Sequence, residues 1–474
     1  MTAQLGFPDD FVWGVATSAT QIEGAASEDE RGPSTWDVFC RRPGKIAGNA
    51  DAAVACDHYH RYREDVSLMA SLGIPAYRFS IAWPRVQPDG EGALNEKGLA
   101  FYDRLIDELL AHGIEPYPTL FHWDLPQALE DKYGGWRSKK VPNCFADYAG
   151  VCAERYSDRV TNWITINEVG NYTVLAYRDD RMAPGGGHFP MQVVNQSLHN
   201  GLLGHGLAVQ ALRAKAKQPL RIGLADNITA PWPVYGAEEH EVAAAKAFLE
   251  TNLTRLFPVM EGRYREQQII RWGKDAPVFT ENEMKAIGAP LDFLGYNIYT
   301  GAAVRHSDRG GGYEFVEGQN FTVAKEDPFQ AGSGYEMIPF PRDYPRTMMG
   351  EWWAHAPRSL YYALKHTQDY FGDMPVFITE NGMAAEDTET VHGEVLDIGR
   401  VEYLRSNLEQ AAKAVQDGYR LKGFFLWTLM DNFEWGFGYT KPFGIVRVDF
   451  TTMERKPKLS AHYFSHVIRE NRVL

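Results

Sequence analysis

The sequence predicts an α/β fold in which eight parallel strands close into a barrel. Two observations lead to this prediction. Eight short apolar runs recur along the 474 residues, and segments of helical period lie between most of them. Strands that alternate with helices favour a parallel sheet joined by right-handed crossovers. No sharp change of composition divides the chain, so residues 1–474 are expected to form one domain, a (β/α)8 TIM barrel with long catalytic-face loops.

The runs expected to be strands are compact, rich in β-branched or aromatic residues and often bounded by Gly or Pro. In chain order they span residues 11–16, 76–83, 114–124, 162–168, 221–227, 291–299, 374–380 and 421–430. Two helices between them have clear ends. Apolar residues 99–109 predict a helix that stops at Gly113, and residues 401–415 predict one closed by Asp417 and Gly418.

Two long intervals, 24–58 and 301–346, interrupt this alternation. The second is rich in Gly, Pro and aromatic residues, including Gly310 to Tyr313. It lies between the sixth and seventh runs, which places it at the catalytic face. It is interpreted either as a surface loop or as a wall on the leaving-group side of the substrate.

Two of the predicted strands end in a glutamate, Glu168 and Glu380. Alternation along each strand places the glutamate on the same face as the apolar residues two and four positions before it. Either glutamate alone is explained by a surface turn. Two of them at the carboxyl ends of barrel strands match the needs of a glycosidase, which sets a proton donor and a nucleophile on opposite sides of a sugar.

Further polar and aromatic residues stand at the ends of the runs or just beyond them. They are Gln21, Arg78, His122, Asn167, Asn297, Tyr299, Trp427, Glu434 and Trp435. Singly, each has a structural explanation, such as an ion pair for Arg78 or a core histidine for His122. A barrel brings strand ends from the whole sequence to one mouth, so together they predict an active site.

Composition excludes several classes of partner. The formal net charge is −14 and no basic cluster occurs, which argues against nucleic acid and against an anionic membrane. The N-terminal residues lack the features of a signal peptide, and no apolar run approaches the length of a membrane span. The four cysteines have no metal-site spacing and are expected as free thiols of a cytoplasmic protein. No metal-ligand motif is present.

Several long motifs resemble the β-glucosidases of glycoside hydrolase family 1 over nearly the full length of the chain. They are FVWGVATSATQIEG at 11–24, YRFSIAW at 77–83, HWDLP at 122–126, WITINE at 163–168, TENG at 379–382, WTLMDNFEW at 427–435 and FGIVRVD at 443–449. The motifs are ordered and correctly spaced along the chain.

The resemblance implies roles for the candidate residues. Glu168 would be the general acid and then the base, with a raised pKa, and Glu380 the ionised nucleophile of a retaining mechanism. Arg78 and Tyr299 would hold the nucleophile. The implied substrate-binding residues are Gln21, His122, Trp123, Asn167, Asn297, Trp353, Trp427, Glu434, Trp435 and Phe443. Asn167 matches the contact to the sugar 2-OH. Trp352 competes with Trp353 for its place.

Two departures from the family pattern stand out. The family usually has proline after the acid/base glutamate, whereas this chain has Val169, which is expected to alter loop geometry without loss of activity. Residues 177–184 are more charged than usual, which bears on leaving-group specificity. Glu434 argues against 6-phosphoglycosides, because it would repel a phosphate, and the presence of Glu168 argues against thioglucosidases.

The implied function is a retaining exo-acting β-glucosidase that hydrolyses β-glucosides or short β-linked oligosaccharides without a cofactor. A β-galactosidase, a β-fucosidase or a transglycosylase of the same family stays open as an alternative. A non-catalytic sugar-binding barrel is the alternative from another class, and the paired carboxylates with their supporting residues argue against it. Assembly into a homo-oligomer is also left open.

Overall fold

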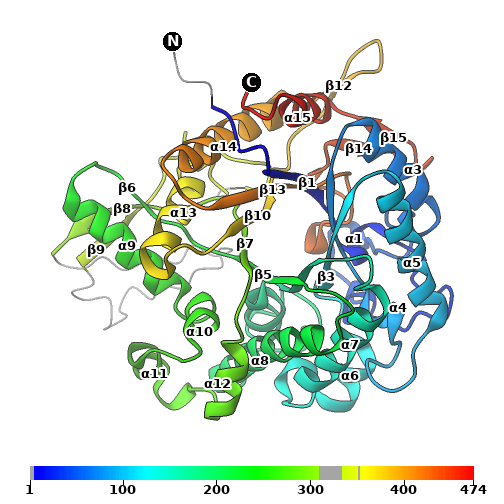
Figure 1. Ribbon diagram of the computed structural model, residues 1–474, viewed down its shortest axis with the longest axis horizontal. Helices are drawn as coiled ribbons and strands as arrows, with labels where there is room; N and C mark the ends of the chain where they lie inside the picture. The colour runs from blue at the N-terminus through cyan, green and yellow to red at the C-terminus, as the bar shows by residue number, and fades with distance from the viewer. Residues whose placement is uncertain (1–4, 309–333, 351–352) are drawn as a thin grey trace.

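The computed structural model describes residues 5–308, 334–350 and 353–474. Eight strands of this part form a closed barrel in the order β1-β13-β10-β7-β5-β4-β3-β2, and all neighbours pair in parallel (Figure 1). They are β1 (Val12–Ala16), β2 (Ala76–Ser80), β3 (Glu115–Phe121), β4 (Asn162–Asn167), β5 (Arg221–Asn227), β7 (Phe293–Asn297), β10 (Val376–Asn381) and β13 (Leu421–Trp427). Each lies on one predicted run, so the predicted (β/α)8 TIM barrel is confirmed.

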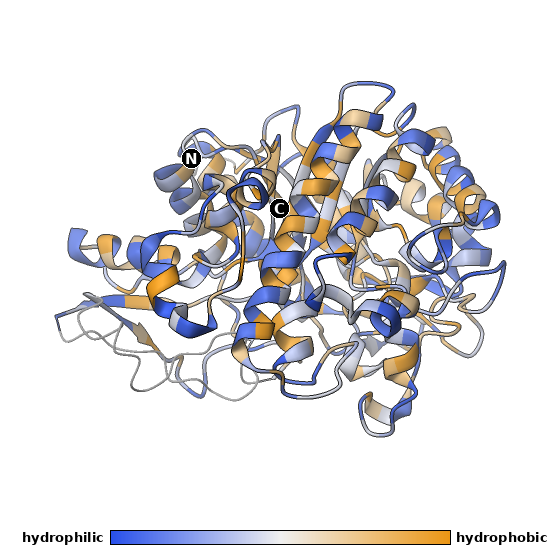
Figure 2. Ribbon diagram, turned by 90° about the horizontal axis from the view of Figure 1, so that it is seen from below, coloured by the Kyte–Doolittle hydropathy of each residue, from blue (hydrophilic) through white to orange (hydrophobic). Residues whose placement is uncertain are grey.

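Helices surround the barrel (Figure 1). The longer ones are α3 (His58–Ser71), α5 (Glu96–Ala111), α7 (Val141–Tyr156), α8 (Met191–Lys215), α9 (Glu238–Asn252), α13 (Arg358–Phe371), α14 (Ile398–Gln416) and α15 (Leu459–Glu470). The short ones are α1 (Ala19–Ile22), α2 (Thr35–Cys40), α4 (Trp83–Val86), α6 (Gln127–Tyr133), α10 (Leu256–Glu261), α11 (Glu266–Trp272) and α12 (Glu281–Ile287). Hydrophilic and hydrophobic residues alternate along the helices seen in Figure 2, as expected when one side of a helix packs against the barrel.

Single turns complete the helical structure. They are η1 (Ala47–Asn49), η2 (Gly135–Arg137), the π-helical η3 (Asn171–Leu175), η4 (Gly273–Asp275) and η5 (Trp435–Phe437). The two predicted helix ends are confirmed. Helix α5 stops before Gly113 (φ 72°), and α14 is capped by Asp417 and followed by Gly418 (φ 92°). Within the described part, no helix combines the length and apolarity needed to cross a membrane.

Small sheets lie outside the barrel. They are β6 (Trp232–Pro233) with β8 (Ala303–Ser307) and β9 (Gly334–Ile338), β11 (Thr388–Glu389) with β12 (Val395–Leu396), and β14 (Val446–Val448) with β15 (Arg455–Pro457). The interval 301–346 therefore contributes the antiparallel pair β8–β9. Its Gly310–Tyr313 stretch lies outside the described residues. The segments around Phe7 and Asn471 lie side by side, and the Phe7 N–H donates to the Asn471 carbonyl at 3.1 Å.

The glutamates do not continue the strand faces that simple alternation predicts. Val376 and Ile378 pack in the outer core between strands and helices, whereas Phe377 packs inside the barrel. The pairing of β10 with β7 shifts register between Ile378 and Glu380, and this irregularity turns Glu380 inward. A similar shift occurs in β4 before Glu168. The predicted shared faces are therefore wrong, although the glutamates do end at the barrel mouth.

Large side chains fill the lower interior of the barrel. Phe425 is fully buried, and its ring centroid lies 4.9 Å from that of Tyr117. The neighbouring strand position is Gly14, where an added Cβ would lie 2.5 Å from the Phe425 ring and 2.8 Å from the Ala76 carbonyl oxygen. Gly14 thus leaves room for the ring, as is typical of a glycine inside a strand that another group approaches closely.

Replacing this ring should destabilise the whole barrel. We expect Phe425→Ala to lower the free energy of unfolding by about 3–5 kcal/mol, because the cavity it leaves cannot collapse inside a closed sheet. Urea denaturation followed by tryptophan fluorescence measures the change. Val391→Ala is the control, since Val391 is 95% exposed and should change stability by less than about 0.5 kcal/mol. Equal effects of the two substitutions would contradict this account of the core.

Candidate active site

A cavity of about 420 Å³ opens at the carboxyl ends of the barrel strands. Its walls include Glu168 directly after β4, Tyr299 after β7, Glu380 in β10 and Trp427 at the end of β13. All predicted site residues line this cavity except Gln21, Arg78 and Asn167. Each of these three lies behind the wall and hydrogen-bonds a residue that lines it. The sequence therefore identified residues that the fold brings together.

Glu380 is held by a cation and a phenol. Arg78 Nη1 lies 2.6 Å from its Oε1, and the Tyr299 hydroxyl donates to Oε2 at 2.6 Å. The side chains of Arg78 and Glu380 are almost fully buried, at 1% and 4% exposure. These contacts are the ones predicted for Arg78 and Tyr299. They fix both oxygens of the carboxylate and leave its orientation little freedom.

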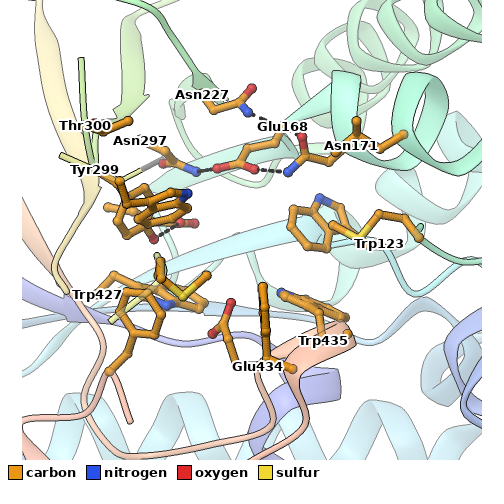
Figure 3. A pocket seen from close by; sticks show the side chains of 18 of the residues that line it. Trp123, Glu168, Asn171, Asn227, Asn297, Tyr299, Thr300, Trp427, Glu434 and Trp435 are labelled. Carbon is orange, nitrogen blue, oxygen red and sulfur yellow. Dashed lines mark hydrogen bonds between the residues drawn. The ribbon is translucent and has the colours of Figure 1, made fainter. Parts of the chain in front are cut away.

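Glu168 has different partners. Its backbone adopts the left-handed region (φ 49°), which is costly for a residue with a side chain, and its N–H donates to the Ala225 carbonyl at 2.8 Å. The Asn297 amide donates to Oε1 at 2.7 Å, and the Asn171 amide donates to Oε2 (Figure 3). Within the described part of the chain, no cation forms an ion pair with Glu168. The described residues thus provide neutral amides, those of Asn297 and Asn171, to hold this carboxyl group.

These surroundings separate the two carboxyl groups electrostatically. Burial raises the pKa of Glu168 well above its ordinary value, and the charge of Glu380 raises it further. Burial also raises the pKa of Glu380, but Arg78 and the Tyr299 hydroxyl oppose that rise. A proton shared by the pair therefore resides on Glu168, and the carboxylate charge stays on Glu380 beside the guanidinium. This division suits one acid and one nucleophile.

Arg78 also orders the residues beside the carboxylates. Its Nη2 donates to Asn167 Oδ1 at 2.6 Å, which fixes the orientation of that amide. The Asn167 Nδ2 then faces His122 Nε2 at 3.2 Å, so Nε2 accepts and the ring proton belongs on Nδ1. Burial and Arg78 lower the pKa of His122 well below its usual value, which keeps the ring neutral. The predicted 2-OH contact of Asn167 stays a prediction.

Aromatic rings form the wall opposite the carboxyl pair. The His122 ring stacks at 5.7 Å from Trp427 and 6.0 Å from Trp435, and Trp123 lies 4.5 Å from Trp435. Glu434 projects between Trp427 and Trp435 (Figure 3). Flat apolar faces with interleaved polar groups suit a sugar, which presents C–H groups on its faces and hydroxyls at its edge.

Glu434 is supported from behind by Gln21. The Gln21 amide nitrogen lies 3.4 Å from Glu434 Oε2 and 2.9 Å from the Phe433 carbonyl, and Gln21 is fully buried. Burial, together with the negative charge of Glu380, raises the pKa of Glu434 to about 8. Glu434 is thus a third carboxyl group in the same cavity, partly buried, where neutral hydroxyls are better partners than anions.

Trp353 and Phe443 close the side near Tyr299. The Trp353 ring lies 4.8 Å from Tyr299 and 6.1 Å from Phe443, and both Trp353 and Phe443 line the cavity as predicted. The competing Trp352 lies outside the described residues. Of the described part of 301–346, only Gly301 lines the cavity.

Several wall residues were not predicted. They are Asn171, Leu175, Arg181, Met182, Asn227, Ile228, Thr229, Arg255, Thr300, Gly301, Met349, Gly436 and Phe437. Asn171, which grips Glu168, follows it by three residues, and Asn227 ends a predicted strand. These positions were the features of the sequence by which the two residues could have been predicted. The remaining residues belong mostly to connecting segments, where sequence pattern carries little positional information.

Val169 occupies the position where the family pattern has proline. It is fully buried, and its backbone N–H is one of the groups that lower the pKa of Asp226 against the rise caused by burial. Arg255 Nε, 2.8 Å from Asp226, acts in the same direction. A proline has no N–H to offer there. Val169 thus keeps a backbone N–H beneath the site and leaves both carboxyl groups in place.

Two buried carboxyl groups with opposite surroundings, set in an aromatic cavity at the mouth of a parallel barrel, define a glycoside hydrolase. The chain belongs to glycosyl hydrolase family 1, whose profile matches residues 3–473. It is 40% identical to beta-glucosidase A of Acetivibrio thermocellus over 99% of both chains, and 42% identical to thermostable beta-glucosidase B of Thermobispora bispora over 98% of this chain and 91% of that one. The solved family 1 β-glucosidase of Thermotoga maritima superposes with a TM-score of 0.87 at 37% identity, over 100% of both chains.

The electrostatic coupling of the carboxyl pair can be measured directly. We expect Glu380→Gln to lower the pKa of Glu168, because the substitution removes a negative charge that raises it. A ¹³C NMR titration of protein labelled at the glutamate carboxyl carbons gives this pKa. Tyr299→Phe is the control, since it keeps the charge at Glu380. A Glu168 pKa that is unchanged or higher in Glu380→Gln would contradict the coupling.

Proposed function

We propose that the protein is a retaining exo-acting β-glucosidase that removes terminal non-reducing β-D-glucosyl residues from β-glucosides or short β-linked oligosaccharides. One observation carries the proposal. Glu380 is held by Arg78 and Tyr299, whereas Glu168 is held by the amides of Asn297 and Asn171. The cation and the phenol stabilise a nucleophilic carboxylate at Glu380. At Glu168 no cation among the described residues forms an ion pair, and burial and the charge of Glu380 raise its pKa, which favours a protonated acid. The β-glucosidase names of the similar proteins support glucose as the sugar.

In the first step, Glu380 attacks the anomeric carbon while Glu168 gives its proton to the glycosidic oxygen. The bond to the leaving group breaks, and the leaving group departs as a neutral alcohol. The product is a glycosyl ester on Glu380. Its formation neutralises the negative charge beside Glu168, so the pKa of Glu168 falls and the residue becomes a base.

In the second step, Glu168 accepts a proton from water and the oxygen of that water attacks the anomeric carbon. The ester bond to Glu380 breaks, and the carboxylate regains its contacts with Arg78 and Tyr299. Two inversions give net retention of the β configuration. The guanidinium and the phenol thus stabilise the anion that leaves in this step, as well as the nucleophile of the first.

The aromatic wall is proposed to hold the glucosyl unit. Trp427 offers a platform for the ring, and Gln21, His122, Glu434 and Trp435 are proposed to bind its hydroxyls. A sugar with a 6-phosphate or another anionic group would face the Glu434 carboxyl group. That contact disfavours anionic sugars and supports a neutral hexose.

The wider setting of the enzyme is also proposed. The four cysteines are free and buried, which supports a cytoplasmic location. The continuous barrel supports residues 1–474 acting as one domain, which a single cooperative unfolding transition would test. A homo-oligomer stays a prediction that light scattering can check.

Removing either carboxyl group should stop turnover in a way that identifies its role. On 4-nitrophenyl β-D-glucoside we expect Glu380→Ala to lose at least about 10³-fold in kcat/KM. Azide should restore cleavage in this variant and yield the α-glucosyl azide, because the anion attacks from the face that Glu380 vacated. Glu168→Ala should lose about 10²–10⁴-fold on poor leaving groups, and azide should then give the β-azide. NMR of the products distinguishes the two anomers.

The control for this experiment is Glu389→Gln, which removes an exposed carboxylate on β11 and should leave activity unchanged. Galactoside, fucoside and 6-phosphoglucoside analogues are assayed alongside. Cleavage that survives in Glu380→Ala without azide would refute the nucleophile assignment. A preference for galactoside or fucoside would replace glucose as the proposed sugar.

A further inference from the structure

The charged run at residues 178–181 follows the η3 turn, which begins at Asn171 beside Glu168 (Figure 3). Three of its four charges are paired. Arg178 contacts both carboxylate oxygens of Asp179 at 2.6 and 2.7 Å, and Asp180 pairs with Lys45 at 2.5 Å. The Gly186 N–H also donates to Asp180 at 2.9 Å. These contacts anchor the segment and leave Arg181 as the remaining charge.

Arg181 lies on the wall of the catalytic cavity. Its backbone N–H donates to the Leu175 carbonyl at 3.3 Å, which ties it to η3, and its side chain is exposed. Across residues 5–308, 334–350 and 353–474, its guanidinium has no hydrogen-bond or ion-pair partner. The cavity's other cation, Arg255, is bound to Asp226 and to the Asn227 carbonyl. Arg181 is thus the cation on this wall that is available to a ligand.

The lining of the cavity as a whole is mainly apolar. Leu175, Met182, Ile228, Met349 and Phe437 line the cavity together with Arg181. The glucosyl unit is assigned to the aromatic wall around Glu434, so the segment after η3 faces the leaving group. A carboxylate on the sugar itself would meet the Glu434 carboxyl group. A carboxylate on the leaving group can reach Arg181 instead.

We propose that Arg181 is a specificity-determining residue that favours leaving groups carrying a carboxylate on an apolar, aromatic body. This inference rests on the proposed β-glucosidase function and names its substrate class. A guanidinium binds a carboxylate through two parallel N–H donors, and the pair is strongest where apolar surface excludes water. The aromatic body would pack on the apolar wall while its carboxylate pairs with Arg181.

A matched pair of substrates isolates this contact. They are 4-(2-carboxyethyl)phenyl β-D-glucoside and its primary amide, which have nearly the same shape and, because a saturated spacer separates the ring from the charge, nearly the same leaving-group reactivity. We expect the wild-type kcat/KM to be about three- to tenfold higher for the acid, as for a partly exposed ion pair. Arg181→Gln should remove this preference by lowering kcat/KM for the acid. Its kcat/KM for the amide should stay unchanged.

Two further variants complete the test. Arg181→Lys should keep part of the preference, because lysine retains the positive charge but lacks the two parallel N–H donors of a guanidinium. Arg63→Gln removes an equal charge from an exposed position of α3, outside the cavity wall, and should keep the full preference for the acid. A wild-type enzyme that cleaves both substrates equally would overturn the inference and leave the β-glucosidase function standing. An equal loss of preference in Arg63→Gln would also overturn it, and cleavage of neither substrate would overturn both proposals.

Discussion

The site depends on one buried cation, the Arg78 guanidinium. It binds Glu380 Oε1, the Thr379 carbonyl, Thr119 and Asn167, and so joins strands β2, β3, β4 and β10. Burying a charge is costly unless its partners satisfy it completely, and here every partner belongs to the barrel wall. The same bonds that stabilise the ion also set the Glu380 carboxylate and the Asn167 amide. Stability and catalytic geometry therefore rest on a single set of contacts.

This arrangement gives three neighbouring carboxyl groups different chemistry. Glu168 and Glu380 are buried, Glu434 is partly buried, and all three have raised pKa values, yet among the described residues only Glu380 of the three contacts a cation. Carboxylates that share a cavity cannot all ionise at low cost, so the one beside Arg78 keeps its charge and the others favour the proton. The position of one guanidinium thus supports the proposed roles of Glu380 as nucleophile and Glu168 as acid.

The sequence predicted the strands and the polar residues at their ends from local pattern, and the family resemblance implied the remaining site residues and the roles. Apolar runs with polar residues at their ends locate the barrel mouth, and Glu168, Glu380, Arg78 and Tyr299 lie where that pattern placed them. Strand faces were predicted wrongly, because alternation assumes a regular ladder and β10 shifts register just before Glu380. The hydrogen bond from the Asn171 amide to Glu168 was not predicted, because it depends on the π-helical turn that follows the strand.

The charged segment at 178–181 illustrates a different limit of the sequence. Four charges in a row read as a solvated loop, and nothing in their order reveals which one meets the substrate. Pairing decides it. Arg178 forms an ion pair with Asp179, and Asp180 forms one with Lys45 from a distant loop. Arg181 has no such partner among the described residues and lies on the cavity wall. In the proposed mechanism, contacts across the barrel strands position the reacting carboxyl groups, while the unpaired charge of Arg181 in a segment after a strand selects the leaving group.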